Sequence, residues 1–220
     1  MSAILVVNPN STEAVTRGID EACAPLRMPG GPQIEALTLN QGPPGIETQQ
    51  HVDGVVAPLL SLIRDKQDSY AAFVIACYSD PGLHALREAT RKPVLGISEC
   101  GILTALTLGQ KFGVIAILQQ SIARHLRYMG ALGVMDRLAA ELPVGLSVVE
   151  LSNEDRTFGR MVAVGKELRG RGADVIVMGC AGMARYRKPL QEALGVPVVE
   201  PTQAAVAMAI GRVRLGWEAA

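Results

Sequence analysis

The chain has 220 residues, 49% of them hydrophobic, and its 21 Lys and Arg residues balance 21 Asp and Glu residues. Balanced charge without a basic cluster gives no basis for binding nucleic acid or a membrane surface, and no apolar run approaches the roughly 20 residues that cross a bilayer. Four unevenly spaced cysteines do not resemble a disulfide framework. Because no export signal precedes the strand-like run that begins at Ile4, we expect a cytoplasmic protein with free thiols.

Short apolar runs alternate with helical patterns along the chain. Strands are predicted at residues 4–7, 71–76, 94–97, 112–118, 175–178 and 198–199. Helices are predicted at residues 55–63, 83–89, 122–132, 158–168 and 190–194, and Ser11 or Thr12 followed by Glu13 is typical of another helix start. The Gly- and Pro-rich segment 42–45 is predicted to be a loop. Continuous apolar strands that alternate with helices are typical of a buried parallel sheet.

An internal repeat divides the sequence. Residues 71–77 resemble residues 173–180, and in both copies a cysteine follows the strand, a helix follows the cysteine, and a Pro-Val pair begins the next strand. We therefore predict an α/β fold of two similar Rossmann-like halves, residues 1–100 and 101–200, with parallel sheets related by a pseudo-two-fold axis. The segment 201–220 is expected to pack back on the first half. Ligands bind at the carboxyl ends of parallel strands, so the active site is expected in the cleft between the halves.

Cys77 and Cys180 are the predicted catalytic residues. Each follows a strand and precedes a helix, so helix amides should favour its thiolate, and a modest fall from the ordinary thiol pKa of about 8.5 would give a base near neutrality. A lone cytosolic cysteine is more often a small buried hydrophobe, but two at matching places in a repeat favour catalysis. Cys23 and Cys100 lack that setting and are assigned to packing.

The sequence predicts neither a cofactor nor a metal. It contains no Cys-x-x-Cys pair, histidine cluster, Walker motif or dinucleotide fingerprint, and no lysine is placed for a Schiff base. His51, His84 and His125 are scattered singly and are interpreted as surface or helix-face residues, although His84 lies close enough behind Cys77 to tune it. Proton transfer by side chains is therefore the expected chemistry.

Several motifs resemble the hydantoin and allantoin racemase branch of the aspartate/glutamate racemase superfamily. Residues 4–12 are similar to the first strand and substrate loop of that branch, residues 76–83 to its first catalytic turn, residues 179–184 to its second, and residues 42–48 to the loop that covers its pocket. The resemblance spans nearly the whole chain. It implies a cofactor-independent racemase with a cysteine pair, a small-molecule substrate and a homo-oligomeric assembly.

One position departs from that branch. Many relatives have a Thr or Ser immediately after the strand that corresponds to residues 114–118, where this chain has Ile117 and Leu118. A pocket hydroxyl is therefore missing unless Gln119, Gln120 or Ser121 replaces it.

The predicted reaction is the racemisation of 5-monosubstituted hydantoins at C5. Loss of the C5 proton to one thiolate gives a planar enolate-like intermediate, which the other thiol reprotonates from the opposite face. Donors near Ser79, Asp80 and Gly182 should stabilise the oxygen charge. The full set of predicted substrate-binding residues is Asn8, Ser11, Thr12, Ile46, Ser79, Asp80, Gln119, Ala181 and Gly182. Helix capping is the competing interpretation of Asn8, Ser11, Thr12 and Asp80, and loop packing that of Ile46.

Other functions stay open at this point. Arg and Lys are absent from the three turns, which favours a neutral ring over the carboxylate of aspartate or glutamate, although Arg185 could reach back. A thiol-dependent decarboxylase or isomerase of the superfamily is another alternative, but an arylmalonate-type decarboxylase would be expected to lack the cysteine at Cys77. A two-lobed small-molecule-binding protein would share the duplicated pattern, yet it would normally carry an export signal and would not need paired thiols.

Overall fold

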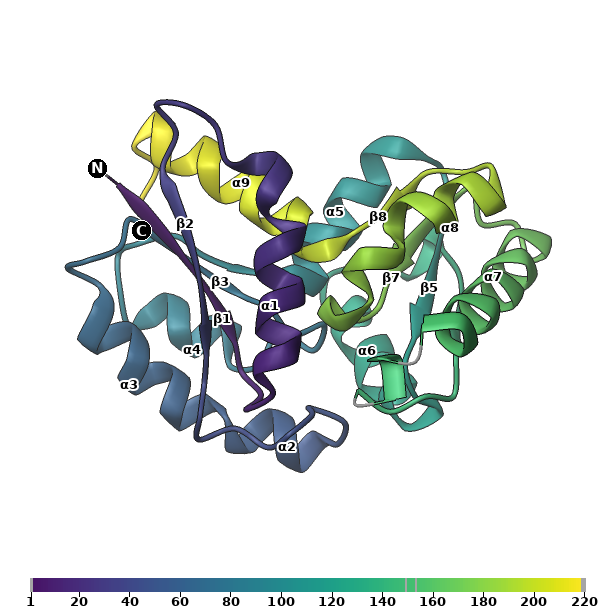
Figure 1. The fold of residues 1–220 in the computed structure, drawn as a ribbon, viewed down its shortest axis with the longest axis horizontal. Helices are drawn as coiled ribbons and strands as arrows, with labels where there is room; N and C mark the ends of the chain where they lie inside the picture. Colours follow the sequence, from purple (N-terminus) through teal and green to yellow (C-terminus); the bar gives the residue numbers. More distant parts are fainter. Residues whose placement is uncertain (1, 149, 153, 219–220) are drawn as a thin grey trace.

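Two parallel four-stranded sheets form the core of the computed structural model (Figure 1). The structure describes residues 2–148, 150–152 and 154–218. Residues 1, 149, 153, 219 and 220, which belong to the predicted halves and C-terminal segment, lie outside the described residues. The first sheet has the order β2-β1-β3-β4 and the second has the order β6-β5-β7-β8. The same order in both sheets confirms the predicted α/β fold of two similar halves.

The first sheet consists of β1 (Ala3–Asn8), β2 (Gln33–Thr38), β3 (Ala72–Ile75) and β4 (Val94–Gly96). The central strands β1 and β3 are buried along their whole length, as expected for a parallel sheet covered on both faces. Val7 pairs with Ile75, so these two strands end at the same edge of the sheet. The turns that follow them therefore lie close together.

The second sheet repeats this arrangement with β5 (Phe112–Ala116), β6 (Leu138–Pro143), β7 (Val175–Met178) and β8 (Val198–Val199). Ile115 pairs with Met178, so β5 and β7 also end together. The chain continues from these strands into the segments that begin at Ile117 and Gly179. Each half thus presents two strand-end segments at one edge.

Helices surround both sheets. Those that precede β5 are α1 (Glu13–Ala22), α2 (Gln49–Gly54), α3 (Val56–Lys66), α4 (Leu83–Glu88) and α5 (Ile97–Leu108). Those that follow it are α6 (Gln119–Ala131), α7 (Glu154–Gly170), α8 (Arg187–Leu194) and α9 (Pro201–Leu215). Short 3-10 helices are η1 (Ala24–Leu26), η2 (Met135–Arg137), η3 (Glu150–Ser152) and η4 (Ala181–Tyr186). Across the described part of the chain, no helix is long and apolar enough to span a membrane.

Two helices connect the halves. Helix α9, the yellow helix of Figure 1, leaves the second sheet and packs on α5 and on the strands β1 and β3 of the first sheet. Helix α1, from the first half, contacts η4, which follows the second predicted catalytic cysteine. The strand-end segments of the two halves are thereby brought to a common interface.

The structure corrects several predicted elements. The helix expected at residues 55–63 is α3, which extends to Lys66, but the short helix α2 that precedes it was not predicted. Strands β2 and β6 were not predicted, because they lie at sheet edges and carry partly exposed residues that interrupt an apolar run. Helices α5 and α9 were missed for the opposite reason. They are buried on several sides and so lack the one-sided apolar period of a surface helix.

Candidate active site

One pocket contains both predicted catalytic cysteines. It encloses about 440 Å³, including its open mouth, and residues from both halves line it. Of the predicted site residues, those that line the pocket are Ile46, Cys77, Ser79, Cys180, Ala181 and Gly182. Cys77 comes directly after Ala76 at the end of β3, and Cys180 occupies the matching place after β7. The sequence repeat therefore becomes a pair of thiols in one pocket.

The two thiols have matching surroundings. The Cys180 sulfur accepts the backbone N–H of Gly182 at 3.4 Å, and the Cys77 sulfur accepts the backbone N–H of Ser79. In each case the donor lies two residues after the cysteine, and both thiols are partly buried. The groups are also close enough for a charge on Cys180 to raise the pKa of Cys77.

Burial decides the ionisation of both thiols. It raises the pKa of Cys77 to about 12 and that of Cys180 to about 11. The backbone N–H groups lower both pKa values, as the sequence predicts, but their effect is smaller than that of burial. The expectation of a net fall in pKa is therefore wrong, and both groups are thiols at neutral pH. Arg124 also lowers the pKa of Cys77, whereas Glu200 and Glu47 raise that of Cys180.

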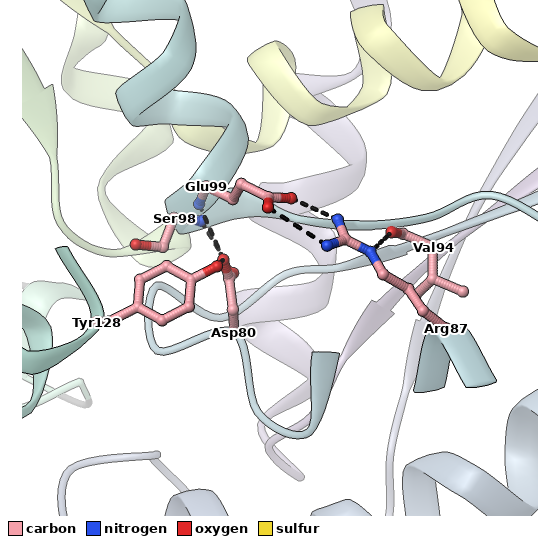
Figure 2. Close-up of polar contacts among 6 residues, drawn as sticks. All are labelled: Asp80, Arg87, Val94, Ser98, Glu99 and Tyr128. Atoms are coloured by element: carbon pink, nitrogen blue, oxygen red, sulfur yellow. Dashed lines mark hydrogen bonds and ion pairs between the residues drawn. The ribbon is translucent and has the colours of Figure 1, made fainter. Parts of the chain in front are cut away.

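Asp80 lies behind the pocket rather than in its lining. Its carboxylate accepts the backbone N–H groups of Ser98 at 2.9 Å and Glu99 at 2.8 Å, and the hydroxyl of Tyr128 at 3.0 Å (Figure 2). Burial raises the pKa of Asp80 to about 7, although these three donors act in the opposite direction. A Cβ atom at Gly96 would lie 2.3 Å from the Asp80 Cγ, so glycine is needed there. This geometry matches the capping interpretation, because Asp80 satisfies donors at the start of α5.

A second set of contacts holds the same junction. Arg87 forms an ion pair with Glu99 and donates to the backbone oxygen of Val94 at 3.0 Å (Figure 2). Helix α4, which follows the Cys77 turn, is thereby tied to β4 and to the beginning of α5. Asp80 and Arg87 together tie the end of the Cys77 turn and helix α4 to β4 and the start of α5.

The segment after β1 places Asn10, not Asn8, in the pocket. Asn8 is fully buried and donates to the side-chain oxygens of Asn10 and Thr16, each at 3.0 Å. The Asn10 oxygen also accepts the backbone N–H of Thr12 at 2.9 Å. Asn10 lines the pocket with its oxygen already engaged, so its amide nitrogen is the donor it can offer.

Ser11 and Thr12 hold the loop that covers the pocket. The Ser11 N–H donates to the Pro43 oxygen at 3.0 Å, and the Thr12 hydroxyl donates to the Pro44 oxygen at 2.8 Å. Thr12 itself lines a neighbouring cavity. The covering loop also reaches the second half, because the Val148 N–H donates to the Glu47 carboxylate at 3.0 Å.

Helix α6 provides pocket residues that the sequence did not identify. Gln119, its first residue and a predicted contact, is exposed and lies outside the pocket lining. Ser121, Arg124 and His125 line the pocket, and their spacing of three and four residues places them on one helix face. Ser121 thus provides a hydroxyl near the position where Ile117 and Leu118 replace the hydroxyl residue of many relatives. The signal that could have found them is this spacing, counted from the strand end.

Arg124 is the cation of the pocket. Its guanidinium donates to the hydroxyls of Ser79 at 2.9 Å and Ser121 at 3.0 Å, and to the backbone oxygen of Glu47 at 3.1 Å. Arg185, the cation expected to reach back, instead pairs with Glu154 at 2.8 Å and lines the neighbouring cavity. The absence of Arg and Lys from the three turns therefore does not make the pocket neutral.

His125 is buried, with 4% of its surface exposed, so of the two interpretations it is a helix-face residue and not a surface residue. Its Nδ1 lies 2.6 Å from the Glu141 carboxylate, and its Nε2 lies 3.3 Å from the Ser79 hydroxyl. His84 is exposed and lines an adjoining cavity, which shares Ser79, Arg124 and His125 with the pocket but not the cysteines. Cys23 and Cys100 are buried in the apolar core, as predicted. Within the described residues, no group of three His, Cys, Asp or Glu side chains is arranged to hold a metal ion.

Comparisons with known proteins point to one family. The family model for Asp/Glu/Hydantoin racemase matches residues 4–209. The hydantoin racemase of Paenarthrobacter aurescens is 32% identical over 220 residues, which cover 98% of this chain and 92% of that protein. The hydantoin racemase of Pseudomonas sp. strain NS671 is 33% identical over 219 residues, covering 97% and 86%. The crystal structure of allantoin racemase from Pseudomonas fluorescens aligns with a TM-score of 0.93 at 29% identity, covering 99% of this chain and 93% of that one.

Proposed function

We propose that this chain, which belongs to the Asp/Glu/hydantoin racemase family, racemises 5-monosubstituted hydantoins by moving the C5 proton between Cys77 and Cys180. The similar proteins are named for hydantoin or allantoin, and both compounds contain the hydantoin ring. One observation carries the two-thiol mechanism. Each half of the chain places a strand-end cysteine, with an amide donor two residues later, in the same pocket.

The chemistry needs one thiolate and one thiol at a time. The thiolate takes the C5 proton, the electron pair of the C–H bond moves into the adjacent ring carbonyl, and an enolate forms. The other thiol then gives its proton to C5 from the opposite face, which leaves it as the thiolate. The enzyme ends with its two protonation states exchanged, so the opposite enantiomer uses the opposite base.

Charge that develops on the ring oxygen requires fixed donors. Arg124 is the cation in the pocket, and its pKa is lowered by burial, which reflects partial removal of the guanidinium from water. The Asn10 amide nitrogen is a further donor. Both groups are held in place by other side chains before substrate arrives, which is the condition under which such donors stabilise a transition state most.

A free amino acid is the second candidate substrate, because Arg124 provides a cation for its carboxylate. The guanidinium uses three of its five N–H donors on Ser79, Ser121 and the Glu47 oxygen, so two are left for a substrate. These two donors suit a ring oxygen as well as a carboxylate, so Arg124 alone does not select between the two classes. A comparison of kcat/KM for a 5-substituted hydantoin, allantoin and aspartate decides between the two classes, and a higher value for aspartate would reject the ring.

The mechanism is tested by replacing the cysteines one at a time. Cys77→Ser and Cys180→Ser should each abolish racemisation, because a serine hydroxyl is far too weak a base at neutral pH. Each variant should still exchange the C5 hydrogen of one enantiomer with deuterated solvent. Cys23→Ser, which changes a buried thiol outside the pocket lining, is the matched control and should racemise both enantiomers. Full racemase activity in either pocket variant would reject the two-thiol mechanism.

We further propose a cytoplasmic, homo-oligomeric protein. The described cysteines are all free thiols, which suits a reducing compartment. Light scattering on the purified chain measures the subunit number, and a monomer at working concentration would reject the oligomer.

A further inference from the structure

A buried hydrogen-bonded chain leads from the second half to the first catalytic turn. Glu141, on β6, accepts from His125 Nδ1 at 2.6 Å, and His125 Nε2 lies 3.3 Å from the Ser79 hydroxyl. In the tautomer whose proton lies on Nδ1, that proton is donated to the carboxylate and Nε2 accepts the Ser79 O–H. The Ser79 oxygen in turn accepts Arg124 Nε at 2.9 Å. The hydroxyl of Ser79 is therefore fixed as both donor and acceptor.

The same imidazole also holds the residue between Cys77 and Ser79. The ring of Tyr78 meets His125 edge to face, with centroids 5.3 Å apart and planes at 76°. Both residues that follow Cys77 thus contact one side chain from the other half of the molecule. His125 and Ser79 line the pocket wall, so this contact lies beside the reacting groups.

The Glu141 carboxylate is buried with only one of its two oxygens hydrogen-bonded among the described residues. Its side chain is fully buried, and Oε2 has no hydrogen-bond partner among the described residues. Burying a carboxylate with one oxygen unsatisfied is unfavourable. The hydrogen bond between His125 Nδ1 and Glu141 Oε1 offsets part of this cost, and the same bond fixes the orientation of the imidazole.

The chain reaches only one of the two thiols. The Ser79 backbone N–H is the donor at the Cys77 sulfur, so the position of Ser79 bears on Cys77 directly. The donor at Cys180 is Gly182, in η4, and the contacts of His125 described above do not include that segment. The two thiols thus have equivalent backbone N–H donors, but only the donor at Cys77 belongs to a residue that His125 contacts.

We propose that His125 and Glu141 are positioning residues for the Cys77 half of the reaction, an inference that rests on the proposed racemase function. They act by holding Tyr78 and Ser79, so that the Ser79 amide stays aligned with the Cys77 sulfur. The Cys180 half of the reaction does not depend on them.

Steady-state racemisation cannot test this inference, because the equilibrium constant between enantiomers is one and kcat/KM must be equal in both directions. Single-thiol backgrounds separate the halves. In Cys180→Ser, exchange of the C5 hydrogen with deuterated solvent reports on Cys77 alone, and in Cys77→Ser it reports on Cys180 alone. His125→Asn, His125→Gln and the exposed control His84→Asn are introduced into each background.

The two His125 variants differ in the atom they retain. Asn places an amide near Nδ1 and loses the contact with Ser79, whereas Gln reaches the Nε2 position. His125→Asn should slow Cys77-dependent exchange about tenfold, the equivalent of one hydrogen bond, and Cys180-dependent exchange less than about twofold. His125→Gln should recover part of the loss. Glu141→Gln should slow the same half of the reaction.

A structural role would give a different pattern. If His125→Asn slows both halves alike, or if Gln is no better than Asn, the positioning role is rejected. Ser79→Ala provides a second route that leaves the His125–Glu141 pair in place. Adding His125→Asn to Ser79→Ala should slow Cys77-dependent exchange by less than a further factor of about two, because both substitutions remove the same bond between His125 and the Ser79 hydroxyl. If the two substitutions instead slow exchange independently, the inference is overturned. If the native enzyme exchanges no C5 hydrogen of any hydantoin, the proposed function itself fails and the inference falls with it.

Discussion

Raising the pH from 6 to 8 should increase kcat/KM for a 5-substituted hydantoin by about tenfold per pH unit. In the proposed mechanism the base is a thiolate, and burial raises the pKa of Cys180 to about 11 and that of Cys77 to about 12. Because both pKa values lie above this range, each added pH unit multiplies the thiolate fraction by about ten. The thiol that donates a proton stays protonated throughout, so no falling limb is expected.

The magnitude follows from the lower of the two pKa values. At pH 7 a thiol with a pKa of about 11 is ionised in about one molecule in ten thousand. The ratio kcat/KM reports the ionisation of the free enzyme, so its logarithm should rise with a slope near one. Cys180 should lose its proton at a lower pH than Cys77.

Two measurements check this prediction. Initial rates are followed by polarimetry at constant ionic strength, after subtracting the enzyme-free rate at each pH. The ultraviolet absorbance of the thiolate is then titrated in Cys77→Ser and Cys180→Ser, with the double variant as the blank. A plateau in kcat/KM below pH 8, or a thiolate signal at pH 7, would mean that one thiol is ionised at rest and that burial does not control the site.

Four further outcomes are expected. Arg124→Gln should lower kcat/KM by roughly 10²-fold, as loss of a preorganised donor does. It should also raise the pKa of Cys77, because the guanidinium lowers that pKa. An unchanged kcat/KM would remove Arg124 from the mechanism. Asp80→Ala should cost about 1–2 kcal/mol of unfolding free energy in urea, because it removes side-chain bonds to a helix start. Gly42→Ala places a Cβ atom 2.1 Å from the backbone oxygen of Pro9, so it should displace the covering loop and raise KM more than it lowers kcat. Activity should survive dialysis against a strong chelator, and recovery of a lost activity by added metal would contradict the prediction of no cofactor.

The central architecture and the cysteine pair were predictable because they depend on local signals. Strands β1, β3, β5 and β7 are buried along their whole length, so each is a continuous apolar run. The repeat then places Cys77 and Cys180 at equivalent strand ends, and parallel sheets gather ligands at that edge. The partly exposed edge strands β2 and β6, and the helices buried on several sides, carry no comparable pattern. The missing elements are therefore those whose surroundings, not their sequences, determine their structure.

The polar part of the site was less predictable, because its contacts cross between segments distant in the sequence. Arg124 bonds Ser79 and the Glu47 oxygen, which lie far from it in the chain. His125 appears isolated in the sequence, since its carboxylate partner Glu141 lies on β6, an edge strand that was not predicted. Asp80 shows the reverse case. Either binding or capping suits its place after Cys77, and only the position of the α5 start decides between them.

The duplicated fold explains why this pocket suits a racemase. In the proposed mechanism each thiol is the base in one direction and the acid in the other, which favours similar pKa values for the two. Burial and one amide donor two residues later apply to both Cys77 and Cys180, and their pKa values lie at about 12 and about 11. A raised pKa makes each thiolate rare, but it also makes each a stronger base towards a carbon acid. Two side chains outside the repeat reduce the remaining difference. Arg124 lowers the higher pKa, that of Cys77, and Glu200 raises the lower pKa, that of Cys180.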